Sequence, residues 1–295
     1  MASPLKFFQL DVFTRQPFCG NPLAVFPWAD GLPGETMQQI AREMNLSETT
    51  FVLPPEDSGH DFRVRIFTPG KEIPFGGHPT LGTAQALKHT GQIAETATNV
   101  VLGMGVGPVP VEWAAGAGFM TQPQPVFTSP IPDRAPVAQA LGLPVADLHP
   151  DFPVQQVSTG FPALLVPLCG AEALQKIGLN LEKLRQVLGG LDLIYPFCVD
   201  TSEPEPQIRA RSFAPFIGIP EDPATGSVAG ALGAYLVEHR VFPARGNTTS
   251  VRIVQGVEMG RPSEISIEIA ANEGAIDSVR VGGDSCVVLE GQLFI

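Results

Sequence analysis

Two copies of one short sequence hold the side chains best suited to chemistry in this chain. His78–Thr83 reads HPTLGT and Asp222–Ser227 reads DPATGS, so both follow the pattern His or Asp, Pro, two residues, Gly, then Ser or Thr. Imidazole and carboxylate groups are common proton carriers in enzymes. The pair therefore predicts proton transfer, with His78 and Asp222 as candidate partners.

Two further pairs of matching segments precede these copies in the same order. Arg65–Pro69 (RIFTP) matches Arg211–Pro215 (RSFAP), and Gly20–Pro22 (GNP) matches Gly160–Pro162 (GFP) more weakly. Three matches at similar offsets predict two related halves. Duplicated halves of this kind usually meet across one site, so we expect the site in the cleft between them.

Each copy also opens a segment that is apolar or small on every face, 80–87 in the first half and 225–237 in the second. A helix without a polar face must be buried on all sides. The neighbouring segments are mostly short and β-prone, so we expect a curved sheet around one central helix in each half. The predicted fold class is α+β.

The starts of these two helices suit the binding of an anion. Pro79 and Pro223 fit a first helical turn, which places His78 and Asp222 at or beside the N-caps. Helix N-termini present free N–H groups and a partial positive charge, and a small carboxylate fits such a place. Asp222 is expected to stay ionised there and His78 to stay neutral. The groups expected to bond substrate oxygens belong to Thr83, Thr225, Gly226 and Ser227.

Plainer interpretations of these residues exist. An Asp before Pro at a helix start is often only a cap. A lone His beside two glycines is more often structural than catalytic. Glycines in both copies can serve close helix–sheet packing alone. The functional interpretation gains its support from the pairing of the two copies.

Glu48 is a third candidate, outside the repeat. It lies in a polar segment that leads directly into the apolar strand 49–53. Burial beside a strand end is expected to raise the pKa of a carboxylate, and a raised pKa suits a general acid or base. The alternatives are that Glu48 caps the preceding helix or faces water.

Composition limits the class of protein. The chain has 295 residues, 44% hydrophobic and 16% charged, as in globular proteins. Its formal net charge of -12 argues against nucleic acid or an anionic membrane as a partner. The sequence shows no secretory signal and no run of eighteen apolar residues, so we expect a soluble cytoplasmic protein.

Cysteine and histidine spacing gives no sign of a metal or a disulfide framework. The four cysteines are scattered and are expected to be buried reduced thiols. The five histidines lack the spacing of metal ligands, so no metal is expected.

The expected elements divide the chain near its middle. The Pro-rich segment 122–132 (QPQPVFTSPIP) is the best candidate linker, with an N-terminal half at 1–120 and a C-terminal half at 121–285. The last strand, 286–295, is expected to join the first half. We expect helices at 34–44 and, interrupted at Gly178, at 171–188; strands are expected at 6–13, 23–26, 49–53, 62–67, 99–102, 109–113, 154–157, 164–168, 193–199, 207–213, 250–254, 264–269 and 279–281.

Several blocks of the chain resemble the phenazine-biosynthesis PhzF family. They span nearly the whole chain in the family's order, and the combination is highly specific. The blocks are Leu10–Phe13 (LDVF), Gly20–Phe26 (GNPLAVF), Ala41–Val52 (AREMNLSETTFV), Phe75–Pro79 (FGGHP), Glu221–Ser227 (EDPATGS) and Gln255–Ser263 (QGVEMGRPS).

This resemblance implies a diaminopimelate-epimerase-like fold, with two pseudo-symmetric domains that each wrap a sheet around a central helix. It also implies a homodimer that needs neither cofactor nor metal. The residue matching the family's proton-shuttling Glu, which isomerises trans-2,3-dihydro-3-hydroxyanthranilate in the phenazine enzyme, is Glu48. His78, Asp222 and Ser227 match residues that assist and bind substrate. The remaining substrate-binding candidates are Gly77, through its backbone N–H, and Asn21.

The related epimerases and racemases use one cysteine from each half, and this chain has none at either helix start. A two-thiol racemase is therefore not expected. The leading hypothesis is a cofactor-independent isomerase of a small carboxylate. The alternatives are an epimerase of an amino-acid-like acid and a non-catalytic protein that binds a metabolite or a partner.

Overall fold

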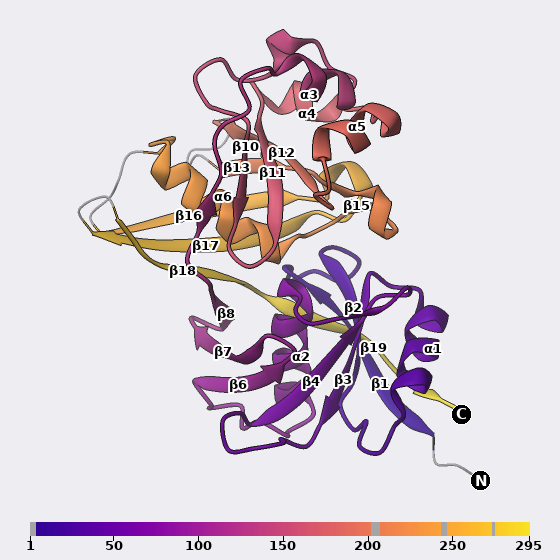
Figure 1. The fold of residues 1–295 in the computed structure, drawn as a ribbon. Helices are drawn as coiled ribbons and strands as arrows, with labels where there is room; N and C mark the ends of the chain where they lie inside the picture. The colour runs from indigo at the N-terminus through magenta and orange to yellow at the C-terminus, as the bar shows by residue number, and fades with distance from the viewer. Residues whose placement is uncertain (1–3, 202–206, 243–246, 273–274) are drawn as a thin grey trace. The chain divides into compact units, whose positions relative to one another are not determined.

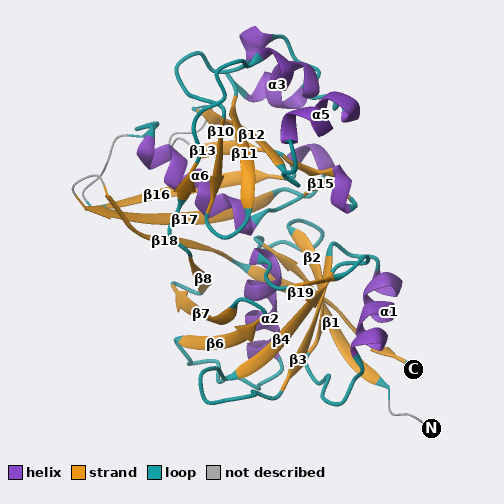
Figure 2. Ribbon diagram, viewed as in Figure 1, coloured by secondary structure: helices purple, strands orange, loops and turns teal. Residues whose placement is uncertain are grey.

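The computed structural model describes residues 4–201, 207–242, 247–272 and 275–295 (Figure 1). The chain divides into two compact units, Met1–Thr121 with Gly282–Ile295 and Gln122–Val281. Strands and helices are mixed in each unit (Figure 2), which is the expected α+β class.

In the first unit, antiparallel and parallel strand pairs alternate. Its elements are β1 (Leu5–Val12), β2 (Asn21–Phe26), α1 (Gly34–Met44), β3 (Glu48–Leu53), β4 (Phe62–Phe67), β5 (Glu72–Ile73), α2 (Gly77–His89), β6 (Asn99–Met104), β7 (Gly107–Ala114), β8 (Ala117–Gln122) and β19 (Ser285–Leu293). β1 pairs antiparallel with β2 and with the C-terminal β19. From β2 the order runs parallel to β3, antiparallel to β4, parallel to β6 and antiparallel to β7.

The second unit has the same succession of pairings. Its elements are β9 (Val126–Phe127), α3 (Ala135–Ala140), β10 (Gln155–Ser158), β11 (Pro162–Pro167), α4 (Ala171–Gln175), α5 (Leu181–Leu188), β12 (Ile194–Asp200), β13 (Gln207–Ala210), β14 (Ser212–Ala214), β15 (Ile219–Asp222), α6 (Gly226–Glu238), β16 (Thr248–Gln255), β17 (Ser263–Asn272) and β18 (Ala275–Gly283), with 3-10 turns at 145–147, 215–217 and 257–259. β10–β11 is antiparallel, β11–β12 parallel, β12–β13 antiparallel, β13–β16 parallel and β16–β17 antiparallel. The duplication predicted from three short sequence matches is therefore present in the topology.

α2 and α6 are the two central helices. α2 contacts β1, β2, β3, β6, β7 and β19, and α6 contacts β10, β11, β16 and β17 (Figure 1). Every residue of 77–84 in α2 and of 228–236 in α6 is buried. This confirms the burial predicted from two segments without a polar face. Of the helices in the described part of the chain, none has both the length and the apolarity to cross a membrane.

The interruption predicted at Gly178 is confirmed, since the segment 171–188 forms two helices, α4 and α5, on either side of it. Two other local predictions are wrong. The segment 207–213 is divided between β13 and β14. All four cysteines are free, but only Cys198 is buried, and Cys169 is exposed on the turn that precedes α4.

Candidate active site

Glu48 and His78 lie side by side in the first unit. Glu48 is the first residue of β3 and His78 the second residue of α2. Glu48 Oε2 lies 3.3 Å from His78 Nε2, and the two side chains are only 13% and 6% exposed. A carboxylate and an imidazole so close together, both largely withdrawn from water, can exchange protons with a bound molecule.

Packing between β3 and α2 fixes this contact. The hydroxyls of Thr50 in β3 and Thr83 in α2 lie 2.8 Å apart and are hydrogen-bonded. At Gly82, an added Cβ would lie 2.6 Å from Leu23 Cδ2 and 2.7 Å from Val12 Cγ2. Only glycine lets α2 approach the sheet this closely. Gly82 therefore serves close packing of the helix on the sheet, which was one of the two interpretations of this glycine.

His78 is neutral at pH 7. Burial lowers the pKa of its imidazole to about 3, because the charged ring would lose its hydration. Within the described residues, Nε2 is buried and makes no hydrogen bond, although Glu48 lies near. The ring therefore offers an uncharged donor or acceptor rather than a fixed cation.

The N-terminus of α2 presents backbone N–H groups beside His78. Gly76 is the N-cap, with φ -158, and accepts the Thr80 N–H at 3.2 Å. Gly77 and His78 occupy the first turn, where N–H groups have no partner within the helix. Gly77 thus lies where its N–H can meet an anion. Asn21, fully buried, is the first residue of β2.

Asp222 has a different position from the one predicted. It is the last residue of β15, and α6 begins at Gly226 with Thr225 as its N-cap. The prediction that Pro223 lies in the first helical turn is therefore wrong. The Thr225 hydroxyl donates to Asp222 Oδ2 at 2.5 Å, which fixes the carboxylate just ahead of the helix. His78, by contrast, lies inside the first turn of its helix.

Two residues that sequence reasoning missed hold the turn at Asp222. Gln255 Nε2 donates to the main-chain oxygen of Asp222 at 2.7 Å and to Thr225 Oγ1 at 3.0 Å. Gln255 Oε1 accepts from the Tyr195 hydroxyl at 2.7 Å and from the Thr225 N–H at 3.2 Å. Burial, and then the charge of Asp222, raise the pKa of Tyr195, so its hydroxyl remains a donor. Gln255 is the first residue of the QGVEMGRPS block, and its place in that block is the one feature of the sequence that could have drawn attention to it.

The other residues expected to bind substrate lie at the start of α6. Gly226 gives its carbonyl oxygen to Gln122 Nε2 at 2.8 Å. Ser227, the second residue of the helix, is half-buried. The structure thus places Thr225, Gly226 and Ser227 next to Asp222 along the chain. Their contact with a substrate stays a prediction, as does a shared cleft for the two helix starts.

Neither a thiol pair nor a metal cluster is found at these positions. Cys19 precedes the turn at Gly20, and Cys286 lies on β19 opposite Asp11 of β1. Across residues 4–201, 207–242, 247–272 and 275–295, no three His, Cys, Asp or Glu side chains are grouped as metal ligands would be.

Solved structures place this fold among the PhzF proteins and epimerases. A PhzF-family phenazine biosynthesis protein from Bacillus anthracis matches with a TM-score of 0.91 at 27% identity, covering 100% of both chains. A predicted epimerase from Pseudomonas aeruginosa matches with a TM-score of 0.77 at 34% identity, covering 98% of this chain and 99% of the other. A hydroxyproline epimerase from Agrobacterium vitis shares the fold alone, with a TM-score of 0.62 at 13% identity over 98% and 92% of the chains.

Sequence comparison gives the same result in more detail. Residues 10–291 match the model of the phenazine biosynthesis-like protein family. The trans-2,3-dihydro-3-hydroxyanthranilate isomerase of Pseudomonas aeruginosa is 37% identical, over 98% of this chain and 99% of its own. The chain belongs to the phenazine biosynthesis-like (PhzF) family, and it is an enzyme of the isomerase class, as the resemblance implied.

Proposed function

We propose that this chain is a cofactor-independent isomerase of a small carboxylate, with Glu48 as the proton carrier. The observation that carries the proposal is the 3.3 Å approach of Glu48 Oε2 to His78 Nε2 at the start of a buried helix. The name of the 37% identical relative, an isomerase of trans-2,3-dihydro-3-hydroxyanthranilate, supports the reaction class.

The proposed reaction needs one carboxylate and no external reagent. Glu48 removes a proton from a carbon activated by a neighbouring double bond, and the electron pair of the broken C–H bond moves into the shifted double bond. The proton on Glu48 exchanges with solvent, and protonated Glu48 then returns one proton to a different carbon. The substrate gains and loses nothing overall, and Glu48 ends as it began.

His78 and Gly77 have separate parts in this proposal. The backbone N–H groups at the start of α2 bind the substrate carboxylate, because the helix dipole favours an anion there. A charged imidazole beside Glu48 would hold the carboxylate as an ion pair and weaken it as a base. The low pKa of His78 keeps the ring neutral, so it orients Glu48 and the substrate through hydrogen bonds.

An epimerase of an amino-acid-like acid is the second candidate. It is favoured by the match to the predicted epimerase from Pseudomonas aeruginosa at 34% identity. An epimerase returns the proton to the carbon that lost it, on the opposite face. The two reactions therefore differ in product, not in the first step.

The test supplies the protein with trans-2,3-dihydro-3-hydroxyanthranilate and, separately, with a panel of chiral amino acids and hydroxy acids. The proposal predicts a change in ultraviolet absorbance on the first compound, because a double bond moves. Inversion of one centre without a change in absorbance would support the epimerase instead. The homodimer implied by the family is tested on the same preparation by light scattering.

A further inference from the structure

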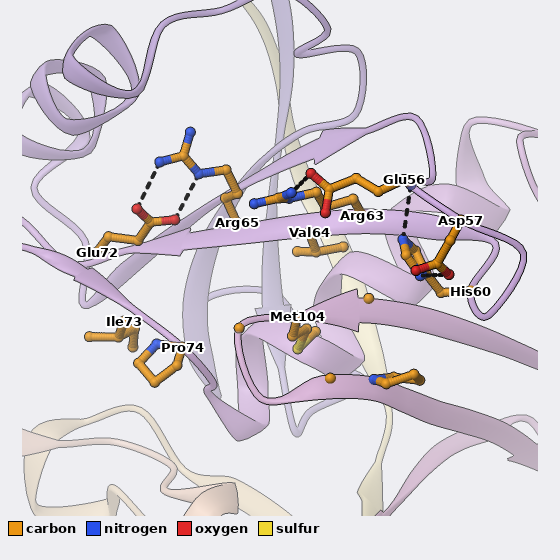
Figure 3. A pocket seen from close by; sticks show the side chains of 14 residues that line it. Glu56, Asp57, His60, Arg63, Val64, Arg65, Glu72, Ile73, Pro74 and Met104 are labelled. Carbon is orange, nitrogen blue, oxygen red and sulfur yellow. Dashed lines mark hydrogen bonds and ion pairs between the residues drawn. The ribbon is translucent and has the colours of Figure 1, made fainter.

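A fork-shaped ion pair links the two strands of the hairpin that precedes α2. Arg65 in β4 donates from Nε to Glu72 Oε1 and from Nη2 to Glu72 Oε2, both at 2.7 Å (Figure 3). The guanidinium also lies over the ring of Phe67, with Cζ 5.1 Å from its centroid. Phe67 is buried, so one side of the arginine is fixed by the core and the other by the carboxylate.

The second unit contains the same arrangement, atom for atom. Arg211 donates from Nε to Glu221 Oε1 at 2.7 Å and from Nη2 to Glu221 Oε2 at 2.8 Å. Its Cζ lies 4.9 Å from the ring centroid of buried Phe213. The arginine and the phenylalanine of each arrangement belong to the repeated phrases RIFTP and RSFAP, to which the proposed function assigns no role. The repeat has preserved a specific contact as well as a fold.

Both carboxylates lie on the strand that leads into the central helix. Glu72 is in β5, which pairs antiparallel with β4, and five residues later α2 begins at Gly77. Glu221 is in β15, which pairs antiparallel with β14, and the next residue is Asp222. Each pair therefore fixes the chain ahead of a candidate site residue, His78 in the first unit and Asp222 in the second.

The pairs are held firmly enough to act as positioning contacts. Hydrogen bonds from Arg65 are the main cause of the lowered pKa of Glu72, so this carboxylate stays charged. Arg211 and Glu221 are only 11% and 18% exposed, and Arg211 Nη1 also donates to Leu174 O at 2.9 Å. Breaking this second pair leaves a buried charge without compensation. The first pair is more accessible, with Arg65 and Glu72 24% and 43% exposed.

A cavity of about 450 Å³ borders the first pair, and its charged groups are largely occupied (Figure 3). Arg63 pairs with Glu56, and His60 lies 3.4 Å from Asp57. With Arg65 held by Glu72, the wall of the cavity offers paired charges rather than an open binding group. The geometry fits a structural role for this face.

We propose that Arg65 and Arg211 are positioning residues, each of which holds a hairpin so that the following residue reaches its working place: His78 in the first unit and Asp222 in the second. For His78 this inference rests on the proposed function, and for Asp222 it rests on the site that the repeat predicts. The arginine fork is essential to it, because lysine can supply the charge but cannot form two parallel hydrogen bonds.

The experiment measures backbone hydrogen exchange and steady-state kinetics in the full-length protein and in Arg65→Lys, Arg211→Lys and Arg280→Lys. Arg280 is the matched control: it pairs with Glu268 at 2.7 Å across β18 and β17, at an exposure close to that of Arg65. If Arg211→Lys does not fold, Glu221→Gln replaces it, since it keeps the shape and removes the charge.

The proposal expects local effects. The hydrogen-bonded amides of 80–84 should exchange about tenfold faster in Arg65→Lys, and those of 228–232 in Arg211→Lys, because a charge-assisted bond is lost in each. With trans-2,3-dihydro-3-hydroxyanthranilate as probe, kcat should fall on the order of 10- to 100-fold, with KM changed by less than about threefold. Arg280→Lys should change neither quantity.

Two outcomes would overturn the inference. In the first, Arg65→Lys and Arg211→Lys have the same exchange rates and the same kcat as Arg280→Lys. The other is faster exchange throughout the protein, which would show general stabilisation only. The reversed pair Arg65→Glu with Glu72→Arg should recover slow exchange at 80–84 relative to Arg65→Glu alone. Exchange needs no substrate, so a failure of the proposed function would leave this result standing.

Discussion

Gln255 Nε2 donates a hydrogen bond of 2.7 Å to the main-chain oxygen of Asp222, and so joins the end of β16 to the end of β15. The two residues are 33 positions apart in sequence, and both are buried. Beside them, an added Cβ on Gly256 (φ +76) would lie 2.6 Å from the Pro223 oxygen. The QGVEMGRPS block thus supports the turn that carries Asp222.

Replacing Gln255 with Leu should destabilise the protein by about 2 kcal/mol or more. The variant removes the hydrogen bonds of Gln255 to the buried Tyr195 hydroxyl and to the Asp222 carbonyl, and each such loss costs roughly 1–3 kcal/mol. Tyr195→Phe is the control, because it removes the donor and leaves Gln255 bonded to Asp222 and Thr225; it should cost about 1 kcal/mol. Urea unfolding measures both. A smaller loss in Gln255→Leu than in Tyr195→Phe would contradict the network.

Replacing Gly82 with Ala should also destabilise the protein, although alanine favours helices. The new Cβ would meet Leu23 and Val12 at 2.6 and 2.7 Å, and both side chains are fully buried. Overpacking of this kind costs about 1–3 kcal/mol, against a gain of about 1 kcal/mol in helix propensity. Gly178→Ala, where no atom lies within 4 Å of the new Cβ, should be close to neutral. Thermal unfolding of the two variants decides the matter: equal midpoints would mean that Gly82 is not a close contact.

The low pKa of His78 should make the protein sensitive to acid. In the unfolded chain the ring takes up a proton near pH 6.5, whereas in the folded protein it does so only near pH 3. Its contribution to stability is therefore complete above about pH 6.5 and is lost as the pH falls from 6.5 towards 3. Between pH 6.5 and 5 the loss is about 2 kcal/mol.

His78→Asn should remove this part of the pH dependence. The pKa of His239 is also lowered by burial, but its contribution is present in both proteins and cancels in the difference. Urea unfolding at pH 7.5, 6.5 and 5 gives the comparison. Parallel stability curves for the wild type and His78→Asn across this range would show that folding does not lower the pKa of His78.

Local patterns in the sequence predicted much of the fold. α1 was predicted at its observed bounds because Met37, Ile40 and Ala41 recur at helical spacing on one buried face. α2 and α6 were recognised because no face of either is polar, and that pattern has few interpretations. β5 has two residues and β14 has three, so neither is long enough to show an alternation.

The site was less predictable, because it depends on contacts between distant segments. Proline is compatible both with the first turn of a helix and with the turn that precedes a helix. At Pro223 the chain takes the second position, and Gln255, which is distant in sequence, holds it there. The contact of Glu48 with His78 needs both the parallel pairing of β2 with β3 and the close packing of α2. Neither fact can be predicted from spacing along the chain. Local sequence therefore offered Glu48 only as one candidate, and the resemblance to a family supplied its role.

Solvent deuterium reports whether Glu48 carries the proton. In D2O, with trans-2,3-dihydro-3-hydroxyanthranilate as substrate, the wild type should place deuterium in the product. Glu48→Gln, which keeps the side-chain size and removes the proton-accepting group, should incorporate none while its circular dichroism stays unchanged. Glu43→Gln, exposed on neighbouring α1, is the control and should match the wild type. Undiminished deuterium incorporation by Glu48→Gln would contradict the account.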